Sequence, residues 1–365
     1  MGFSFKKTKP GTWVLRPDFI WALILPWVRH GLDTTVKSCS CSTEGQCSKP
    51  APRTFPGLLG QRGHSARRGT RGIWMLSSAL PAERDYDGPE TDSQRWSAFA
   101  PRMDDIVVCT PSKSGTNWVQ AILALLLTGD PQVDAAPATQ APWIDMRDEP
   151  LEVLLARLEA MTGRRQVKTH TPLDGIPFWS DLRYITVYRH PIDVHFSMRS
   201  HVLNMKENPF PGLFPDDPRD SFHQFLDHTV TDATGLKEIV GHFRATYARG
   251  ERANLLRLHY ADLQRDLPGA TAQIAGHVGI SHPAPLMTEL VHSARFATMK
   301  ANAARVAPLA GWSFWRDDAA FFASGTSNKW EGILMQDDLA AYDARISALL
   351  EPEARRWLEW GGQAE

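Results

Sequence analysis

Residues 106–127 read IVVCTPSKSGTNWVQAILALLL, and this stretch decides the fold. The apolar run at 106–108 predicts a buried strand, and the apolar run at 119–127 predicts a buried helix. The loop between them carries Lys113, Gly115 and several hydroxyl residues. Such a loop can hold a phosphate, because backbone N–H groups at a helix N-terminus point at the anion and a lysine adds positive charge. Taken alone, the loop also fits an ordinary strand-to-helix turn.

The loop lacks the G-x-x-x-x-G-K-[ST] spacing of ATP- and GTP-hydrolysing P-loops, because Lys113 precedes Gly115. It resembles instead the loop P-K-S-G-T-T-W of the sulfotransferases that use 3′-phosphoadenosine 5′-phosphosulfate (PAPS). The matching residues are Lys113, Ser114, Gly115, Thr116 and Trp118, with Asn117 in place of the second Thr and Ser112 in place of the Pro. The resemblance implies that Lys113 stabilises the leaving phosphate, that residues 114–117 cradle the 5′-phosphate and that Trp118 stacks on adenine.

A second motif follows the predicted strand at 165–169, where the chain reads VKTHTP from Val167 to Pro172. A histidine at a strand's carboxyl end can face a ligand cleft, although by residue type alone His170 is more often a surface or hydrogen-bonded histidine. The stretch is similar to the K-x-H-x-P element of the same family. The resemblance implies that His170 is the general base and that Lys168 holds the sulfonate.

A third motif joins the predicted strand at 183–188 to a helix that begins at Pro191, a residue suited to the first helical turn. Arg189, Pro191, Asp193 and Ser197 stand in the register of the family element R-[DN]-P-x-D-x-x-x-S, with His190 as a departure. The resemblance implies that Arg189 and Ser197 bind the 3′-phosphate of PAPS. The alternative for an isolated match is a surface arginine and a helix serine.

A late segment, GTSNKWEG at 325–332, resembles the family's G-x-x-x-x-W element near the adenosine. The family arginine that precedes this element is replaced by Ala323, which puts one contact to the 3′-phosphate in doubt. The backbone N–H of Gly325 is still available to contact the 3′-phosphate. Lys329, Arg316 and Arg295 are candidates to replace the missing arginine. Tyr260 and Phe296 match family aromatic residues near the adenine, whereas Ala294 replaces a family Thr.

The composition describes an ordinary globular protein with no global field for a charged partner. The chain has 365 residues, 42% of them hydrophobic and 22% charged, and a formal net charge of −1. We therefore expect no nucleic-acid or membrane partner, and an anion site would have to be local. No segment reaches transmembrane length, and no common metal-ligand motif is present, so we expect no metal cofactor.

The pattern of apolar and polar residues changes near Met75. Residues 1–74 lack sustained periodicity and contain Cys39, Cys41 and Cys47, while the lone Cys109 is expected in a buried strand. We expect 1–74 to be disordered or to be an upstream extension outside the natural protein, with a signal peptide as the weaker alternative. Residues 75–365 are expected to form a single sulfotransferase domain, located in the cytoplasm.

Alternating apolar segments predict an α/β fold of the P-loop type, in which helices flank a central parallel sheet in three layers. The strands are expected at 105–110, 165–169, 183–188 and 254–259. The helices are expected at 117–128, 151–162, 191–205, 221–228, 233–248 and 339–350. The long connection at 204–220 suggests either a lid over a pocket or a packed surface loop.

Together the motifs predict transfer of a sulfuryl group from PAPS to a small-molecule alcohol, phenol or amine. Trp143, Phe178, Trp179, Phe210 and Phe214 are candidates for an apolar acceptor pocket. Two alternatives stay open: a nucleotide-dependent phosphotransferase, and a catalytically silent relative that binds the product nucleotide PAP, 3′-phosphoadenosine 5′-phosphate. The acceptor and the oligomeric state cannot be read from the sequence.

Overall fold

A computed structural model describes residues 6–7, 13–14, 79–88, 90–133, 141–207, 214–227, 235–307, 314–322 and 325–362. Contacts within the chain divide it into two units, Met1–Met75 and Leu76–Glu365. In the first unit, the described residues form the antiparallel strands β1 (Lys6–Lys7) and β2 (Trp13–Val14). Cys39, Cys41 and Cys47 lie outside the described residues. All that follows concerns the second unit.

The second unit is built on a parallel sheet of four described strands in the order β4-β3-β5-β6. Its strands are β3 (Ile106–Cys109), β4 (Gln166–Thr169), β5 (Arg183–Tyr188) and β6 (Leu255–His259). Val107 pairs with Val167 on one side and with Tyr184 on the other, so β3 is central. The four predicted strands are thus confirmed to within a residue at each end.

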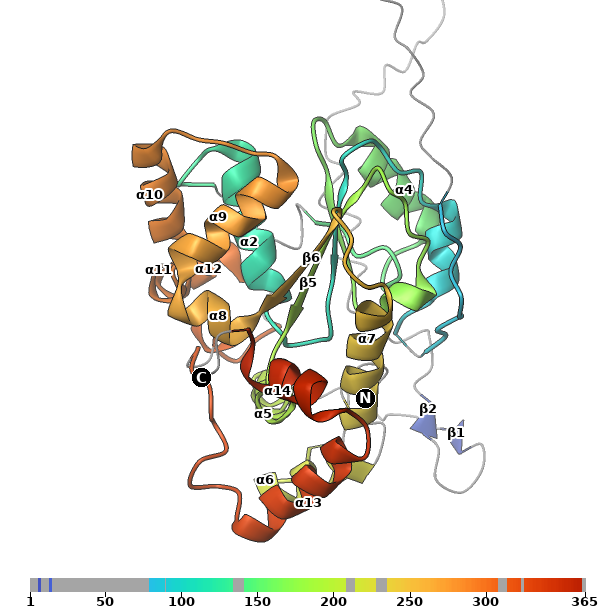
Figure 1. The fold of residues 1–365 in the computed structure, drawn as a ribbon, viewed down its shortest axis with the longest axis vertical. Coiled ribbons are helices and arrows are strands. Elements are labelled where there is room, and N and C mark those ends of the chain that lie inside the picture. Colours follow the sequence, from blue (N-terminus) through green and yellow to red (C-terminus); the bar gives the residue numbers. More distant parts are fainter. Residues whose placement is uncertain are drawn as a thin grey trace, which may run out of the picture. The chain divides into compact units, whose positions relative to one another are not determined.

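The central strands are apolar throughout because helices cover both faces of the sheet. Side chains alternate between the faces with a period of two. Ile106, Val108, Ile185 and Val187 enter one core cluster with helices α2, α9 and α10. Val107, Cys109, Val167 and Tyr184 enter another, with η1 and α4. This confirms the three-layer arrangement, and Figure 1 shows the helices on either side of the strands.

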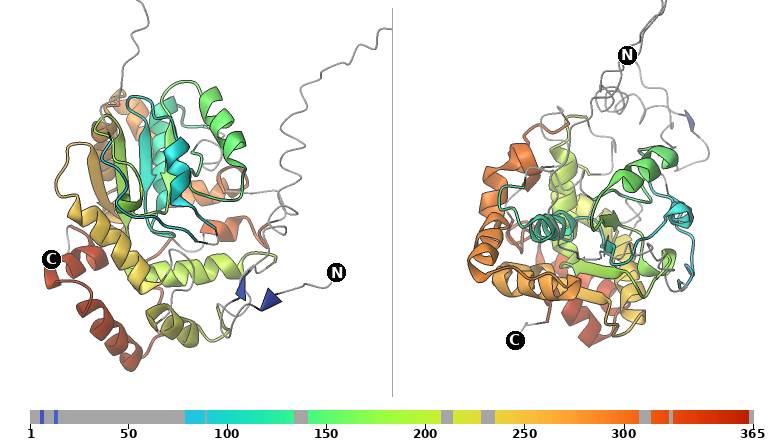
Figure 2. Two further views of the ribbon diagram at one scale, coloured as in Figure 1. Left: turned by 90° about the vertical axis from the view of Figure 1, so that its right-hand side faces the viewer. Right: turned by 90° about the horizontal axis from the view of Figure 1, so that it is seen from above.

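Helices precede, separate and follow the strands in the chain. They are η1 (Ser93–Ala98), α2 (Thr116–Thr128), α4 (Leu151–Ala160), η2 (Leu173–Gly175), α5 (Pro191–Leu203), α6 (Pro218–Asp227) and α7 (Leu236–Ala248). After β6 come α8 (Tyr260–Arg265), α9 (Leu267–Val278), α10 (Ala284–Ser293), α11 (Phe296–Ala301), α12 (Ala303–Val306), η3 (Ala319–Phe322), α13 (Gln336–Ser347) and α14 (Pro352–Trp360). Figure 2 shows the same elements from two further sides.

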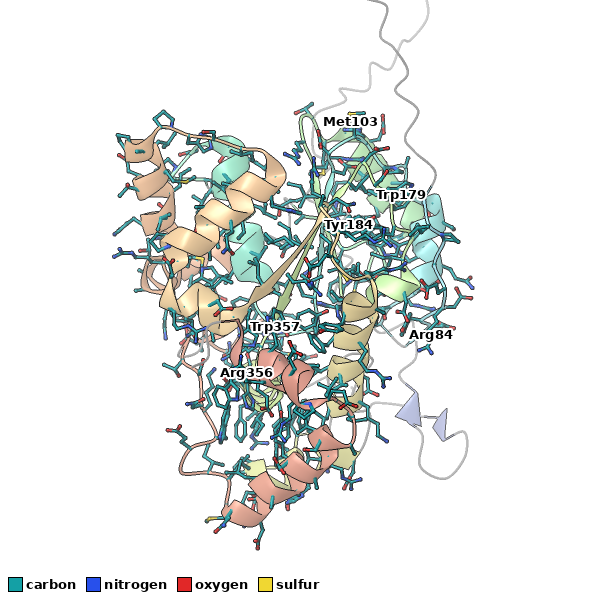
Figure 3. The ribbon with its side chains drawn as sticks, viewed as in Figure 1. Arg84, Met103, Trp179, Tyr184, Arg356 and Trp357 are labelled. Carbon is teal, nitrogen blue, oxygen red and sulfur yellow. The ribbon has the colours of Figure 1, made fainter. Side chains whose placement is uncertain are left out.

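A third core cluster packs α5, α6, α7, α13 and α14 around the end of β5. Trp357 of α14, labelled in Figure 3, lies with its ring centroid 5.7 Å from that of Phe243 and 6.0 Å from that of Tyr188. None of the helices in the described part of the chain is both long and apolar enough to cross a membrane.

Two helix ends carry the residues typical of them, whereas α4 ends at a Met161 cap, two residues before Gly163. Gly129 ends α2 in the left-handed conformation at φ 64°, and Pro191 occupies the first turn of α5. The segment 260–306 was predicted without helices and contains α8 to α12, and α14 was also missed. α13 begins three residues before the predicted 339. In the connection 204–220, residues 208–213 lie outside the described residues, so the lid stays a prediction.

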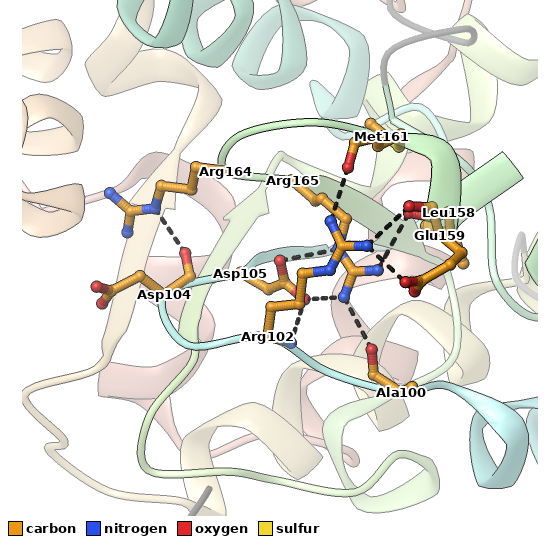
Figure 4. A network of polar contacts seen from close by, with 9 residues as sticks. All are labelled: Ala100, Arg102, Asp104, Asp105, Leu158, Glu159, Met161, Arg164 and Arg165. Carbon is orange, nitrogen blue, oxygen red and sulfur yellow. Dashed lines mark hydrogen bonds and ion pairs between the residues drawn. The ribbon is translucent and has the colours of Figure 1, made fainter. Parts of the chain in front are cut away.

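A buried ion pair ties the beginnings of β3 and β4 together (Figure 4). Arg165, 2% exposed, donates from Nε to Oδ1 of Asp105 at 3.0 Å, and Asp105 is 1% exposed. Asp105 also accepts the Arg102 backbone N–H at 2.7 Å, while Arg165 donates to the Ala100 carbonyl at 2.8 Å. This network closes the amino end of the sheet, opposite the edge where the predicted site residues emerge.

Replacing Asp105 with Asn should lower the free energy of unfolding by about 3–5 kcal/mol, because the buried guanidinium would lose its counter-charge. The matched control is Asp104→Asn, which removes a half-exposed carboxylate 3.7 Å from Arg183 and should change the stability by less than about 1 kcal/mol. Urea denaturation of both variants measures the difference. Equal losses would contradict the role assigned to the buried pair.

Candidate active site

The predicted motifs meet at the carboxyl edge of the sheet. The loop after β3 carries Lys113, the end of β4 carries Lys168 and His170, and Arg189 follows β5 directly. β3 lies between β4 and β5, so the three segments are neighbours in space. Ligands of open parallel sheets bind outside the carboxyl ends of the strands, which makes this edge the candidate site.

The loop after β3 is shaped by a glycine that no other residue replaces without strain. Gly115 has φ 120°, and a Cβ atom there would lie 3.1 Å from the ring of Tyr260. Lys113 also has a positive φ of 60°. Thr116 begins α2, and its hydroxyl bonds to that of Thr110 across the loop. The first turn of α2, with Thr116 and Asn117, therefore faces the loop's interior with its free backbone N–H groups.

His170 is held in one tautomer by the backbone of the same loop. Its Nδ1 lies 2.6 Å from the carbonyl oxygen of Thr110, so Nδ1 carries the hydrogen and Nε2 is left to accept a proton. The Trp143 ring stands edge-on to the imidazole with the centroids 4.6 Å apart. Burial, followed by the charge of Lys168, lowers the pKa of His170 to about 3. The imidazole is therefore neutral at physiological pH.

Lys168 lies beside the histidine and against the same tryptophan. Its Nζ is 4.5 Å from the centroid of the Trp143 ring, a cation–π contact. Burial lowers its pKa to about 8, although the charges of Asp148 and Asp145 oppose the shift. Trp143 thus positions both candidate catalytic side chains of β4.

Arg189 is buried at the end of β5 with part of its guanidinium left over. It is 5% exposed and lies 4.3 Å above the Tyr260 ring. One Nη donates to the Thr326 carbonyl at 2.9 Å, and Nε lies 3.8 Å from an Asp193 oxygen, beyond hydrogen-bond distance. Within the described residues Nε has no hydrogen-bond partner. A buried donor without a partner normally indicates a missing ligand or water.

The late segment is fastened to the same place by Asp193. The Asp193 carboxylate accepts the backbone N–H groups of Asn328 and Lys329, each at 3.3 Å. Burial, followed by the charge of Arg189, lowers the pKa of Lys329 to about 8. Of the other two candidate substitutes, Arg316 donates to the Met205 carbonyl at 3.0 Å, and Arg295 is exposed at the start of α11.

Lys113, Lys168, Arg189 and Lys329 form what we call the cation cluster. Burial and the charges of the other three members, with Lys329 the strongest, lower the pKa of Lys113 to about 7. Like charges this close destabilise one another. Among the carboxylates near the cluster, Asp145 and Asp148 act on Lys168, and Asp193 is shared between Arg189 and the two backbone amides. The cluster is therefore suited to an anion of high charge.

His201 is a member of the site that the sequence reasoning missed. Its Nδ1 lies 2.9 Å from the Lys113 Nζ, and its ring centroid is 4.8 Å from that of Trp315. Burial and the charges of Lys113 and Lys168 hold its pKa well below the usual value. The signal was present, because His201 follows Ser197 by four residues and Asp193 by eight, on one face of α5.

The other predicted site residues lie in the loop after β3, on α5, at the start of α11 and in the late segment. Ser114 is fully buried in the loop, and Ser197 lies partly buried on α5 one turn beyond Asp193. Phe296 packs against Gly325, where a Cβ atom would lie 2.6 Å from the ring, and Gly325 has φ 64°. Ala323 lies outside the described residues.

Two aromatic residues near the loop are part of the core. The Trp118 indole N–H donates to the Ala294 carbonyl at 2.8 Å, and its ring meets Tyr260 edge-on at 5.3 Å. Trp118 is 8% exposed, so little of its ring is open for stacking. Tyr260 connects this core to the site, because its ring lies under Arg189 and beside Gly115.

The predicted acceptor pocket needs correction at two residues. Phe178 stacks on Tyr184 at 4.2 Å, and Trp179 meets Phe99 at 6.1 Å. Both belong to the core cluster around η1 and α4 and not to the site. Phe214 is buried, with its ring 6.3 Å from that of His195, and Phe210 lies outside the described residues.

No group of three or more His, Cys, Asp or Glu side chains in the described segments could hold a metal ion. The free thiol of Cys109 is buried in β3 as predicted, and burial raises its pKa.

Comparison with known proteins connects this geometry to a family. The family model "Sulfotransferase domain" matches residues 103–352. A glycolipid sulfotransferase of Mycobacterium bovis is 30% identical over 307 residues, which cover 76% of this chain and 94% of the relative. The fold is similar to that of a retinol dehydratase solved with retinol and PAP, at a TM-score of 0.59 and 20% identity, over 72% of this chain and 87% of that one. A mouse sulfotransferase complexed with PAP gives a TM-score of 0.56 at 18% identity, over 72% and 90% of the two chains. The chain therefore belongs to the sulfotransferase family.

Proposed function

We propose that this protein transfers a sulfuryl group from PAPS to a hydroxyl group of a small acceptor. The observation that supports this most is the cation cluster beside His170, a neutral imidazole whose Nε2 can accept a proton. The positive charge of the four cations needs a counter-charge, and a donor with a 5′-phosphosulfate and a 3′-phosphate would supply it. The match of residues 103–352 to the family model agrees with this assignment.

The donor would lie with its phosphosulfate over the loop after β3. Ser114, Gly115, Thr116 and Asn117 would cradle the 5′-phosphate, and the backbone N–H groups of the last three would bind it as at other helix N-termini. The Ser114 N–H donates to the Pro111 carbonyl at 3.4 Å. Lys113 and Lys168 would hold the phosphosulfate oxygens. Arg189 and Ser197 would bind the 3′-phosphate. Tyr260, Phe296 and Gly325 would surround the adenosine, with Trp118 packed against Tyr260 as support. When bound, the donor supplies the activated sulfuryl group.

The chain's own residues would perform the proton transfer and the charge stabilisation. His170 takes the acceptor's hydroxyl proton at Nε2 while the new O–S bond forms and the bond between sulfur and the phosphate oxygen breaks. Lys113 stabilises the charge that grows on that phosphate oxygen, which is the largest contribution in comparable group transfers. The anion raises the pKa of His170 from its value in the empty site, because an opposite charge favours the imidazolium.

The acceptor class is proposed from the relatives and from the walls of the site. The Mycobacterium bovis relative is named a glycolipid sulfotransferase, so a sugar hydroxyl on an apolar carrier is the first acceptor to test. Trp143 beside His170 and Phe321 beside His201 (ring centroids 4.6 and 5.8 Å apart) are partly exposed and provide apolar surface for such a carrier.

The proposal is tested by incubating the protein with ³⁵S-labelled PAPS and EDTA across a panel of glycolipids, simple alcohols, phenols and amines. Labelled product without a divalent metal supports sulfuryl transfer. Turnover that requires Mg²⁺ and ATP would favour a phosphotransferase, and binding of PAP without any turnover would favour a silent relative.

His170→Asn should lower kcat by about 10²–10⁴-fold, because the variant cannot take up the acceptor proton. PAP affinity should stay within about twofold, since the histidine does not bind the nucleotide in this account. The matched control is His292→Asn, an exposed residue in the last turn of α10 that should leave both quantities unchanged. Parallel loss of turnover and PAP affinity would contradict the assignment of His170 as the base.

PAP binding should take up protons between pH 7 and 9, and the affinity should fall as pH rises across this range. The sign follows from the pKa values of about 7 for Lys113 and about 8 for Lys168 and Lys329. A bound polyanion raises these values, so the complex holds more protons than the free protein, and each lysine contributes up to about tenfold per pH unit. Calorimetry in buffers of different ionisation enthalpy counts the protons.

The matched variants for this experiment are Lys113→Met, which should reduce the proton uptake, and Lys300→Met on α11, which should not. Affinity that is flat from pH 7 to 9 would show that the lysines are already fully charged in the free protein.

A further inference from the structure

The sequence lacks the arginine expected for the 3′-phosphate, yet the buried part of that subsite still has an unmatched donor. Arg189 uses one Nη on the Thr326 carbonyl, and its Nε has no hydrogen-bond partner within the described residues, because the Asp193 carboxylate is 3.8 Å away. Arg189 is 5% exposed, so this donor cannot be satisfied by bulk water. A ligand oxygen within hydrogen-bond distance of Nε would satisfy it.

The late segment is held at Asp193 by two backbone hydrogen bonds. Asp193 Oδ2 accepts the Asn328 amide and Asp193 Oδ1 accepts the Lys329 amide, both at 3.3 Å. Asn328 has φ 59°, a left-handed turn that brings the two amides onto one carboxylate. The same carboxylate lies 3.8 Å from Arg189. The backbone of Lys329 is therefore held within one carboxylate of the unmatched donor.

Ser197 lies on the same side of α5 as Asp193. Residues four apart on a helix are neighbours, with Cβ atoms about 5–6 Å apart. Asp193 thus holds the Lys329 backbone near Arg189, on the face of α5 that also carries Ser197. A lysine's flexible four-carbon stem allows its charge to reach a phosphate bound there.

From this placement we propose that Lys329 replaces the missing arginine and binds the 3′-phosphate together with Arg189 and Ser197. The inference rests on the proposed function, since it assumes a nucleotide with a 3′-phosphate. The electrostatics agree, because Arg189 is the charge that most lowers the pKa of Lys329, and Lys329 is the charge that most lowers that of Lys113.

The role predicts a specific change in nucleotide discrimination. Lys329→Gln should weaken PAP binding by about 10–100-fold, the effect of removing a charge-assisted hydrogen bond. Binding of AMP, which has no 3′-phosphate, should change by less than about twofold, because Lys329 does not reach the 5′-phosphate in this placement. A residue that only supported the fold would weaken both nucleotides.

The experiment is a calorimetric titration of PAP and AMP into wild type, Lys329→Gln, Lys329→Arg and the control Lys300→Gln. Lys329→Arg and Lys300→Gln should keep the wild-type preference for PAP. The inference is overturned if Lys329→Gln keeps that preference, if it loses PAP and AMP equally, or if Lys329→Arg loses as much as Lys329→Gln. Wild-type protein that does not distinguish PAP from AMP would overturn the proposed function as well.

Discussion

The concentration of positive charge at one edge of the sheet is the constraint on which the rest of the site depends. Lys113, Lys168, Arg189 and Lys329 come from four separate segments and are brought together in a partly buried space. Burial lowers the pKa values of the three lysines, and repulsion by neighbouring cations adds to the shift at Lys113 and Lys329. The net charge of the chain is −1, so this positive charge is local. In the proposed function, a bound polyanion would offset the repulsion.

Contacts of the sheet, of Tyr260 and of His190 position the segments that form this edge. Asp105 and Arg165 fasten the opposite end of β3 and β4 through a buried ion pair. Tyr260 touches the loop glycine and lies under Arg189, so the first and third motifs share one aromatic ring. His190, which departs from the family's Asp or Asn, still caps α5, because its Nδ1 accepts the Ile192 N–H at 3.3 Å. The substitution thus preserves the helix entry that positions Asp193 and Ser197.

Features that depend on neighbouring residues in the chain could be predicted from the sequence. Contacts between residues far apart in the chain could not. The strands were found because their apolar runs end in motif residues such as His170 and Arg189. Helices α8, α11 and α12 were missed because they have only six, six and four residues, too few for a helical pattern to show. Helices α9 and α10 were missed although Pro268 and Pro285 stand in their first turns, the position that Pro191 has in α5. The contact of His201 with Lys113 joins residues 88 apart, and Lys329 depends on Asp193, 136 residues earlier. No local pattern reports such pairs. Trp179 was assigned to the acceptor pocket on residue type alone. Residue type does not show whether a side chain packs in the core or lines a pocket.

The central claim is that the cation cluster is a nucleotide site built for two separate phosphate groups. The most direct measurement is a calorimetric titration of PAP into the wild-type protein in EDTA, with ATP and AMP as comparisons. The account predicts metal-independent binding of PAP that is tighter than that of AMP or ATP by at least about tenfold, as expected for one added charge-assisted contact. Equal affinities for PAP and AMP, or binding that appears only with Mg²⁺ and ATP, would contradict it.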